Sequence, residues 1–158
     1  MFRQAFAEDI KGILEFAHEL KDQNAKMSFV DYVDEDFLRL HLNDPLIFIY
    51  LAYDDDKVIA LFRGIRGQGA KDHSVYVACA VKKEFRNKSL ATNITNYALE
   101  DFKTKGILIA RTKIYSWNKG SVATIKKCGF ELSGRVFMHE YMSEIDDYID
   151  DLIFHKKL

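Results

Sequence analysis

VKKEFRNKSLATNI, residues 81–94, is the most informative stretch of this 158-residue chain. It leaves a β-rich run, passes through a short polar turn and opens an amphipathic helix. The first turn of a helix has unpaired N–H groups and a partial positive charge of about half a unit, which together favour a phosphate or pyrophosphate. Arg86 and Lys88 add cationic donors at the same point. These residues predict an anion-binding corner between a strand and a helix.

The residues before this corner predict a short strand, two helices and three strands. A strand over residues 2–6 precedes a helix whose N-cap is Asp9, and residues 22–31 form a polar loop. Asp34 caps a second helix, which Pro45 closes. The β-rich runs that follow are joined by turns and predict antiparallel strands over residues 46–53, 58–66 and 74–81.

The residues after the corner alternate between helices and strands. The helix that opens at Leu90 ends near Gly106, and the next strand, residues 107–115, runs parallel to its partner because a helix intervenes. Asn118 caps a short helix that ends at Gly129. The remaining residues form closing strands around an acidic turn at residues 144–147.

The corner resembles the acetyl-CoA-binding motif of the GNAT superfamily of N-acetyltransferases. Members read Val-x-Pro-x-Tyr/Phe-Arg-Gly/Asn-x-Gly-Ile/Leu-Gly/Ala at the end of their fourth strand, and NKGSVATIKKCGF (118–130) is similar to a second family signature. The resemblance covers nearly the whole chain and implies one domain over residues 1–158. The implied fold is α/β (α+β), with about four helices and a mixed, mostly antiparallel sheet of six to seven strands that splays between strands four and five. The residues aligned with the first motif are Val81, Lys83, Phe85, Arg86, Asn87, Ser89, Leu90 and Ala91.

The resemblance also implies a binding site for acetyl-CoA. Main-chain amides near Ala80 and Val81 would pair with the pantetheine arm as an added strand does. Asn118 and Ser121 match positions that contact the cofactor arm or hold the strand ends, although an N-cap and a first-turn residue explain them equally well. The turn that would wrap the pyrophosphate consists of Arg86, Asn87, Lys88, Ser89, Leu90 and Ala91.

Two positions depart from the family pattern. Ser89 stands where a glycine is usual, and its Cβ is expected to weaken phosphate binding. Ile125 stands where many members have a tyrosine that protonates the departing thiolate, and isoleucine has no proton to donate. Tyr115 or Tyr141 could replace that acid, with a packed aromatic residue as the alternative for each. The candidates for the base that deprotonates an ammonium substrate are Glu84, Asp72, His73 and, through water, Tyr76.

Composition narrows the remaining classes of function. A formal net charge of −1 gives no positive field for nucleic acid or an anionic membrane, and no stretch reaches membrane-spanning length. No histidine pairs with a second ligand at metal spacing, so no metal is expected. Cys79 and Cys128 are expected to be buried free thiols. A cytoplasmic setting follows as the default.

The sequence therefore predicts an N-acetyltransferase that transfers an acetyl group from acetyl-CoA to a primary amine of a small molecule or peptide by direct attack. The alternative is an acyl-CoA-binding regulatory or interaction module without turnover. A homodimer through the closing strands is plausible for the family. Four carboxylates that could favour a cationic substrate, or could be ordinary solvated helix-terminal charges, are Asp31, Asp34, Glu35 and Asp36.

Overall fold

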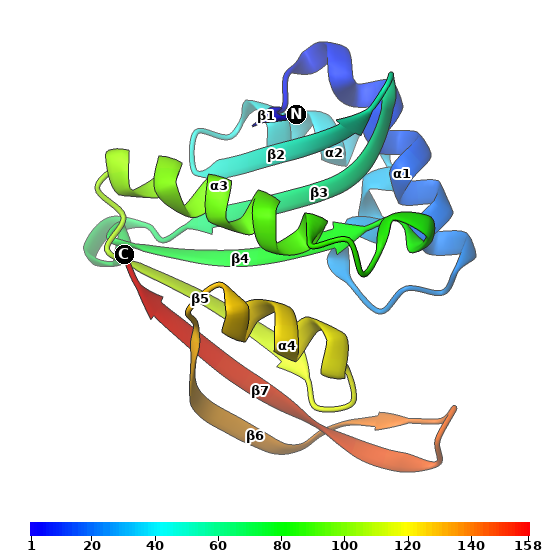
Figure 1. Cartoon of the computed structure of the whole chain (residues 1–158), viewed down its shortest axis with the longest axis vertical. Helices are drawn as coiled ribbons and strands as arrows, with labels where there is room; N and C mark the ends of the chain where they lie inside the picture. The colour runs from blue at the N-terminus through cyan, green and yellow to red at the C-terminus, as the bar shows by residue number, and fades with distance from the viewer.

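A seven-stranded sheet in the order β1-β2-β3-β4-β5-β7-β6 organises the computed structural model, which describes residues 1–158 (Figure 1). Every neighbouring pair is antiparallel except β4 and β5, which are parallel. The sheet thus agrees with the predicted mixed, mostly antiparallel architecture. The strands are β1 Phe2–Gln4, β2 Ile47–Asp54, β3 Lys57–Arg66, β4 Ser74–Val81, β5 Ile109–Tyr115, β6 Glu131–Met142 and β7 Asp147–Lys157.

Four α-helices cover the two faces of this sheet: α1 Ile10–Asp22, α2 Glu35–Asn43, α3 Leu90–Thr104 and α4 Lys119–Lys127. Helices α3 and α4 lie on one face and pack on a core of 19 buried residues. Helices α1 and α2 lie on the other face over a second core of 14 buried residues. None of the helices combines the length and apolar character needed to cross a membrane.

Helix α3 buries the stripe that its sequence predicts. Ile94, Ala98 and Phe102 recur at helical spacing and are all buried against the sheet. The helix lies so close to β3 that a Cβ added to Gly64 would stand 2.5 Å from the ring of Phe102. Glycine is therefore required at Gly64 for the helix that begins at the predicted anion corner to sit on the sheet.

The N-terminal third differs from prediction at two places. Residues 22–31 were expected to be a loop, but Ser28–Val33 forms a 3₁₀ helix because Phe29 and Tyr32 bury their rings in the core beneath α1 and α2. Asp9 does not cap α1 with its carboxylate, which is already bound elsewhere. The predicted caps at Asp34 and Asn118 are confirmed, because their side chains accept hydrogen bonds from the N–H groups of Phe37 and Ser121.

Strands β4 and β5 pair over only three residues. The pairs are Ser74 with Ile109, Val75 with Ala110, and Tyr76 with Arg111. Beyond Tyr76 the two strands diverge toward their carboxyl ends, while β5 stays paired with β7 as far as Tyr115 (Figure 1). The sheet is therefore splayed where the sequence predicts, and α3 and α4 both begin at the open end.

Candidate functional site

The corner between β4 and α3 presents a run of free main-chain donors. The first hydrogen bond of α3 joins the N–H of Asn93 to the carbonyl of Ser89 at 2.9 Å. The N–H groups of the six residues 87–92 donate to no acceptor of the protein. These donors lie at the positive end of a 15-residue helix, so the corner can bind an anion through its backbone alone.

Two cationic side chains flank these amides. Arg86 is exposed and donates from Nε to the carbonyl of Val81 at 3.1 Å, which holds its guanidinium beside the end of β4. Lys88 extends its ammonium over the ring of Phe85, 5.3 Å from the ring centroid. The corner carries no carboxylate ion-paired to either side chain, and both cations remain available to a phosphate.

Ser89 adopts the backbone conformation that favours glycine. Its φ is +59° and its ψ is 9°, in the left-handed region, and its hydroxyl forms no capping hydrogen bond. A residue with a Cβ pays about 1–2 kcal/mol for this conformation. The turn thus keeps a shape suited to glycine, and the serine bears the strain.

The open edge of β4 offers further main-chain groups. The N–H of Lys82 donates to Ile59 of β3, whereas the carbonyl of Val77 points the other way and accepts from the hydroxyl of Thr112 on β5. Because these directions alternate along a strand, Val81 and Cys79 direct their N–H groups into the opening between β4 and β5, which we call the gap. Ala80 directs its main-chain groups toward β3, where its register partner is Leu61.

The two thiols near the gap are poor nucleophiles. Burial raises the pKa of the Cys79 thiol to about 12, and burial also raises the pKa of Cys128. Both cysteines are free. A thiol must ionise to attack a thioester, so neither residue is suited to carry an acetyl group at neutral pH.

The other predicted residues lie at different distances from the gap. Asn118 and Tyr115 lie at the carboxyl end of β5, which faces the corner across the open end of the splay. Glu84 is exposed in the short 3₁₀ turn Lys83–Phe85. Tyr141 lies beside the β6–β7 turn, where its hydroxyl donates to Asp146, two strands from the gap. Ile125 is buried in the core beneath α4.

Tyr115 is the best placed of the predicted acids. Its hydroxyl donates to Glu140 Oε2 at 2.7 Å. This hydrogen bond, with some burial, raises the pKa of Tyr115 to about 12. The phenol therefore keeps its proton at neutral pH and directs it to Glu140.

Strand alternation places three side chains on the same face of the sheet, opposite α3 and α4. Tyr76 is the last β4 residue paired with β5, and Tyr115 and Asp151 are register partners on β5 and β7. Burial and the charge of Asp151 raise the pKa of Tyr76. Sequence reasoning missed Asp151 as part of this group. The sequence contained a signal for its position, since Ile149 and Asp151 are two residues apart, lie on the same side of β7 and are both buried.

Arg63 is a second charged residue that sequence reasoning missed. It lies on β3, on the face covered by α1 and α2, and is only 6% exposed. Its guanidinium donates to the hydroxyls of Ser28, at 2.6 Å, and Tyr32, at 3.3 Å, and stacks 5.0 Å from the ring centroid of Phe29. Hydroxyls and aromatic faces thus hold this cation without an ion pair.

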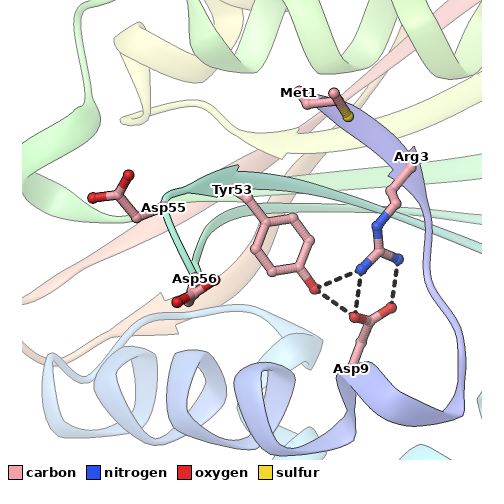
Figure 2. A pocket seen from close by; sticks show the side chains of 6 residues that line it. All are labelled: Met1, Arg3, Asp9, Tyr53, Asp55 and Asp56. Carbon is pink, nitrogen blue, oxygen red and sulfur yellow. Dashed lines mark hydrogen bonds and ion pairs between the residues drawn. The ribbon is translucent and has the colours of Figure 1, made fainter.

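The pocket drawn in Figure 2 lies elsewhere, at the edge of the sheet formed by β1 and the β2–β3 turn. Asp9 lies at its base and binds Arg3 through both oxygens at 2.7 Å, while the hydroxyl of Tyr53 donates to it at 2.6 Å. Asp55 and Asp56 point away from this cluster in the same view. No group of three or more His, Cys, Asp or Glu side chains is arranged to hold a metal ion.

Comparison with solved structures finds close likeness in fold at low sequence identity. A ribosomal-protein-alanine N-acetyltransferase from Brucella melitensis is 16% identical, with a TM-score of 0.84 over 100% of this chain and 99% of that one. A spermidine N-acetyltransferase from Vibrio cholerae is 19% identical, with a TM-score of 0.79 over 99% and 94%. A ribosomal-protein α-N-acetyltransferase in complex with coenzyme A is 15% identical, with a TM-score of 0.82 over 99% and 93%.

No curated protein sequence matches the chain. The family model described as the acetyltransferase (GNAT) family matches residues 11–130, about three quarters of the sequence, and includes the splayed strands, the anion corner and both signature motifs. The chain therefore belongs to the GNAT family of acetyltransferases.

Proposed function

We propose that the protein transfers the acetyl group of acetyl-CoA to a primary amine of a small molecule or a peptide. The observation that carries the proposal is the run of six unpartnered amides at residues 87–92, next to a strand edge that β5 leaves open. A diphosphate fits the first feature and a chain of amide groups fits the second. Acetyl-CoA contains both and supplies a thioester as the acetyl donor.

Several residues of this chain have distinct roles in the proposed complex. Residues 86–91 would surround the pyrophosphate, with Arg86 and Lys88 neutralising its charge. The N–H groups of Cys79 and Val81 would hydrogen-bond the pantetheine arm. The cap formed by Asn118 fixes the start of α4 on the other side of the gap, and Ser121 lies in its first turn.

The proposed transfer is direct attack by the amine, without an acetylated protein intermediate. The raised pKa values of Cys79 and Cys128 keep both thiols protonated at neutral pH. As the N–C bond forms and the C–S bond breaks, Tyr115 would donate a proton to the departing thiolate and recover one from the attacking nitrogen, so that the phenol ends as it began. Free thiols and the absence of a disulfide suit the cytoplasm, which is part of this proposal.

A module that binds acyl-CoA without turnover is the second candidate. The burial of Ile125 favours it, because the position where many relatives have a tyrosine lies in the core and has no proton to donate. The strained turn at Ser89 would weaken coenzyme binding in either case. The two candidates therefore share a binding site and differ in catalysis.

A homodimer is also part of the proposal. Strand β6 is an edge of the sheet, so its outer main-chain groups lack a partner strand. It also exposes large apolar side chains, including Phe137 at 73% and Met138 at 63%. An exposed apolar edge of this kind suits association with a second copy.

Replacing Arg86 by alanine tests the coenzyme site. We expect a roughly ten-fold or greater rise in the Kd of acetyl-CoA, because a charge-assisted hydrogen bond to phosphate is lost. Isothermal calorimetry measures this affinity. Arg39→Ala is the matched control, since Arg39 is exposed on α2 and pairs only with Glu35.

The same preparations separate enzyme from module. Release of free thiol from acetyl-CoA is followed with spermidine, an alanine-terminated peptide and benzylamine as acceptors. Steady amine-dependent release supports the enzyme, whereas tight binding without release supports the module. An unchanged Kd in Arg86→Ala, or no heat from the wild-type protein, would overturn the assignment of the corner.

A further inference from the structure

Asp151 is a buried carboxylate without a hydrogen bond. The residue is 4% exposed, and no hydrogen bond of the protein ends on its carboxylate. Its two carboxylate oxygens are still reached by solvent, because no fully buried side-chain oxygen of the protein lacks a partner. The two nearest basic side chains are Lys113, whose Nζ lies 3.9 Å from Oδ2, and His139, whose Nε2 lies 3.8 Å from it. Both distances exceed the 2.7–3.2 Å of an ordinary N–H···O hydrogen bond.

The carboxylate of Asp151 therefore depends on the little solvent that reaches it for its hydrogen bonds. A carboxylate that loses most of its hydration gains from any donor that replaces the lost hydrogen bonds. An ionised carboxylate can accept about four hydrogen bonds, and Asp151 accepts none from the protein. Lys113 and His139 have side chains that are about half and two fifths exposed, and neither closes onto Asp151.

The position of Asp151 associates it with the opening of the sheet. It lies opposite Tyr115 on β5, on the face that carries Tyr76 and that α3 and α4 leave uncovered. Pairing of β4 with β5 ends at Tyr76, so this face is open beside the point of divergence. The charge of Asp151 contributes to raising the pKa values of both Tyr76 and Tyr115, after burial of the first and the Glu140 hydrogen bond of the second.

We propose that Asp151 binds the ammonium group of the acceptor, so that the acceptor is an aliphatic amine that is cationic at neutral pH. This inference rests on the proposed function and specifies its substrate class. An ammonium supplies up to three N–H donors to the unused acceptor capacity of the carboxylate. Because only the neutral amine can attack the thioester, the bound ammonium gives one proton to solvent before the acetyl group is transferred. An arylamine, neutral at pH 7, would gain little from this site. Arg63 is a buried cation on the same side of the sheet, closer to α1 and α2. Its positive charge would repel an ammonium beneath those helices, which leaves Asp151 as the favoured position.

Benzylamine and aniline test the inference as acceptors of similar size and different charge. We expect the wild-type protein to favour benzylamine in KM, and Asp151→Asn to raise the KM for benzylamine about ten-fold to a hundred-fold with kcat less affected. The Kd of acetyl-CoA should stay unchanged, because Asp151 lies away from the corner. Asp151→Glu, which keeps the charge, should recover part of the lost affinity.

Asp147→Asn is the matched control. Asp147 lies on the same strand, is exposed, and accepts only the N–H of the next residue, Tyr148, at 2.7 Å. It should leave the KM for benzylamine unchanged. Circular dichroism and thermal unfolding confirm that each variant is folded before its kinetics are compared.

Three outcomes separate this inference from the proposed function. An unchanged KM in Asp151→Asn, or equal use of aniline and benzylamine by the wild type, would overturn the role of Asp151 while leaving the acetyltransferase intact. If no amine supports thiol release, the proposed function fails and calorimetry with benzylamine decides. The role of Asp151 then stands only if the wild-type protein, saturated with coenzyme A, binds benzylamine and Asp151→Asn does not.

Discussion

Asp9 and Asp151 are two carboxylates with nearly equal burial and opposite surroundings. Asp9 is 6% exposed and receives two hydrogen bonds from Arg3, one from Tyr53 and one from the N–H of Phe6 (Figure 2). Asp151 is 4% exposed and receives none. The difference separates a carboxylate that joins segments of the chain from one that accepts no hydrogen bond from the protein and that we propose as a binding group for the acceptor.

The pKa of Asp9 reflects these contacts. Burial alone would raise it, but the hydrogen bonds from Arg3, Tyr53 and Phe6 outweigh burial and lower the pKa below its ordinary value. The cluster joins β1, the start of α1 and the end of β2, three segments distant in sequence. Its role is therefore structural.

The largest change in the free energy of unfolding should come from Asp9→Ala. The change leaves Arg3, Tyr53 and the N–H of Phe6 without their acceptor, and we expect the free energy of unfolding to fall by about 2–4 kcal/mol. Urea denaturation measures the loss. Acetyl-CoA affinity of the folded variant should be unchanged. A loss under about 1 kcal/mol would mean that water replaces the carboxylate, and would break the comparison.

Acid should remove part of the same stabilisation. Because the pKa of Asp9 is lower in the folded chain than in the unfolded chain, its contribution is present above the unfolded value and is lost as the pH falls through the folded value. The difference in unfolding free energy between wild type and Asp9→Ala should therefore become smaller below the ordinary carboxyl pKa of 3.8. Urea titrations at several pH values between about 3 and 7 follow this difference. A difference that stays constant over the range contradicts the assignment.

The smallest change in the free energy of unfolding should come from Asp151→Asn. No hydrogen bond is lost and a buried charge is removed, so the free energy of unfolding should change by less than about 1 kcal/mol, with stabilisation the expected sign. The same urea experiment gives the value. A loss as large as that of Asp9→Ala would show that Lys113 and His139 already satisfy this carboxylate.

Local sequence patterns predict most of the fold, including the strand, turn and helix that form the corner at residues 81–94. The turn at residues 81–94 and the caps at Asp34 and Asn118 depend on neighbours in sequence, and the structure confirms the elements that they predict. The 3₁₀ helix at Ser28–Val33 was not predicted, because its burial depends on helices elsewhere in the chain. The bidentate contact of Asp9 with Arg3 was also not predicted. The local sequence around an aspartate that caps a helix does not differ from that around one that binds a distant arginine.

The acceptor side was harder to predict than the coenzyme side. The proposed phosphate-binding turn is built from consecutive residues, whereas Tyr76, Tyr115 and Asp151 come from three strands and share a face only through register. Asp151 also follows another aspartate, so the pair has the appearance of a solvated acidic tail. Only the alternation with buried Ile149 distinguishes it.

The three residue pairs that join β4 to β5 have a consequence for how such a protein can change over time. Strand pairing between the β1–β2–β3–β4 half of the sheet and the β5–β7–β6 half is confined to this short seam. Substitutions on β7 and β6 should therefore alter the face that carries Asp151 while the turn between β4 and α3 keeps its shape. The seam lets one half diversify while the other stays constant.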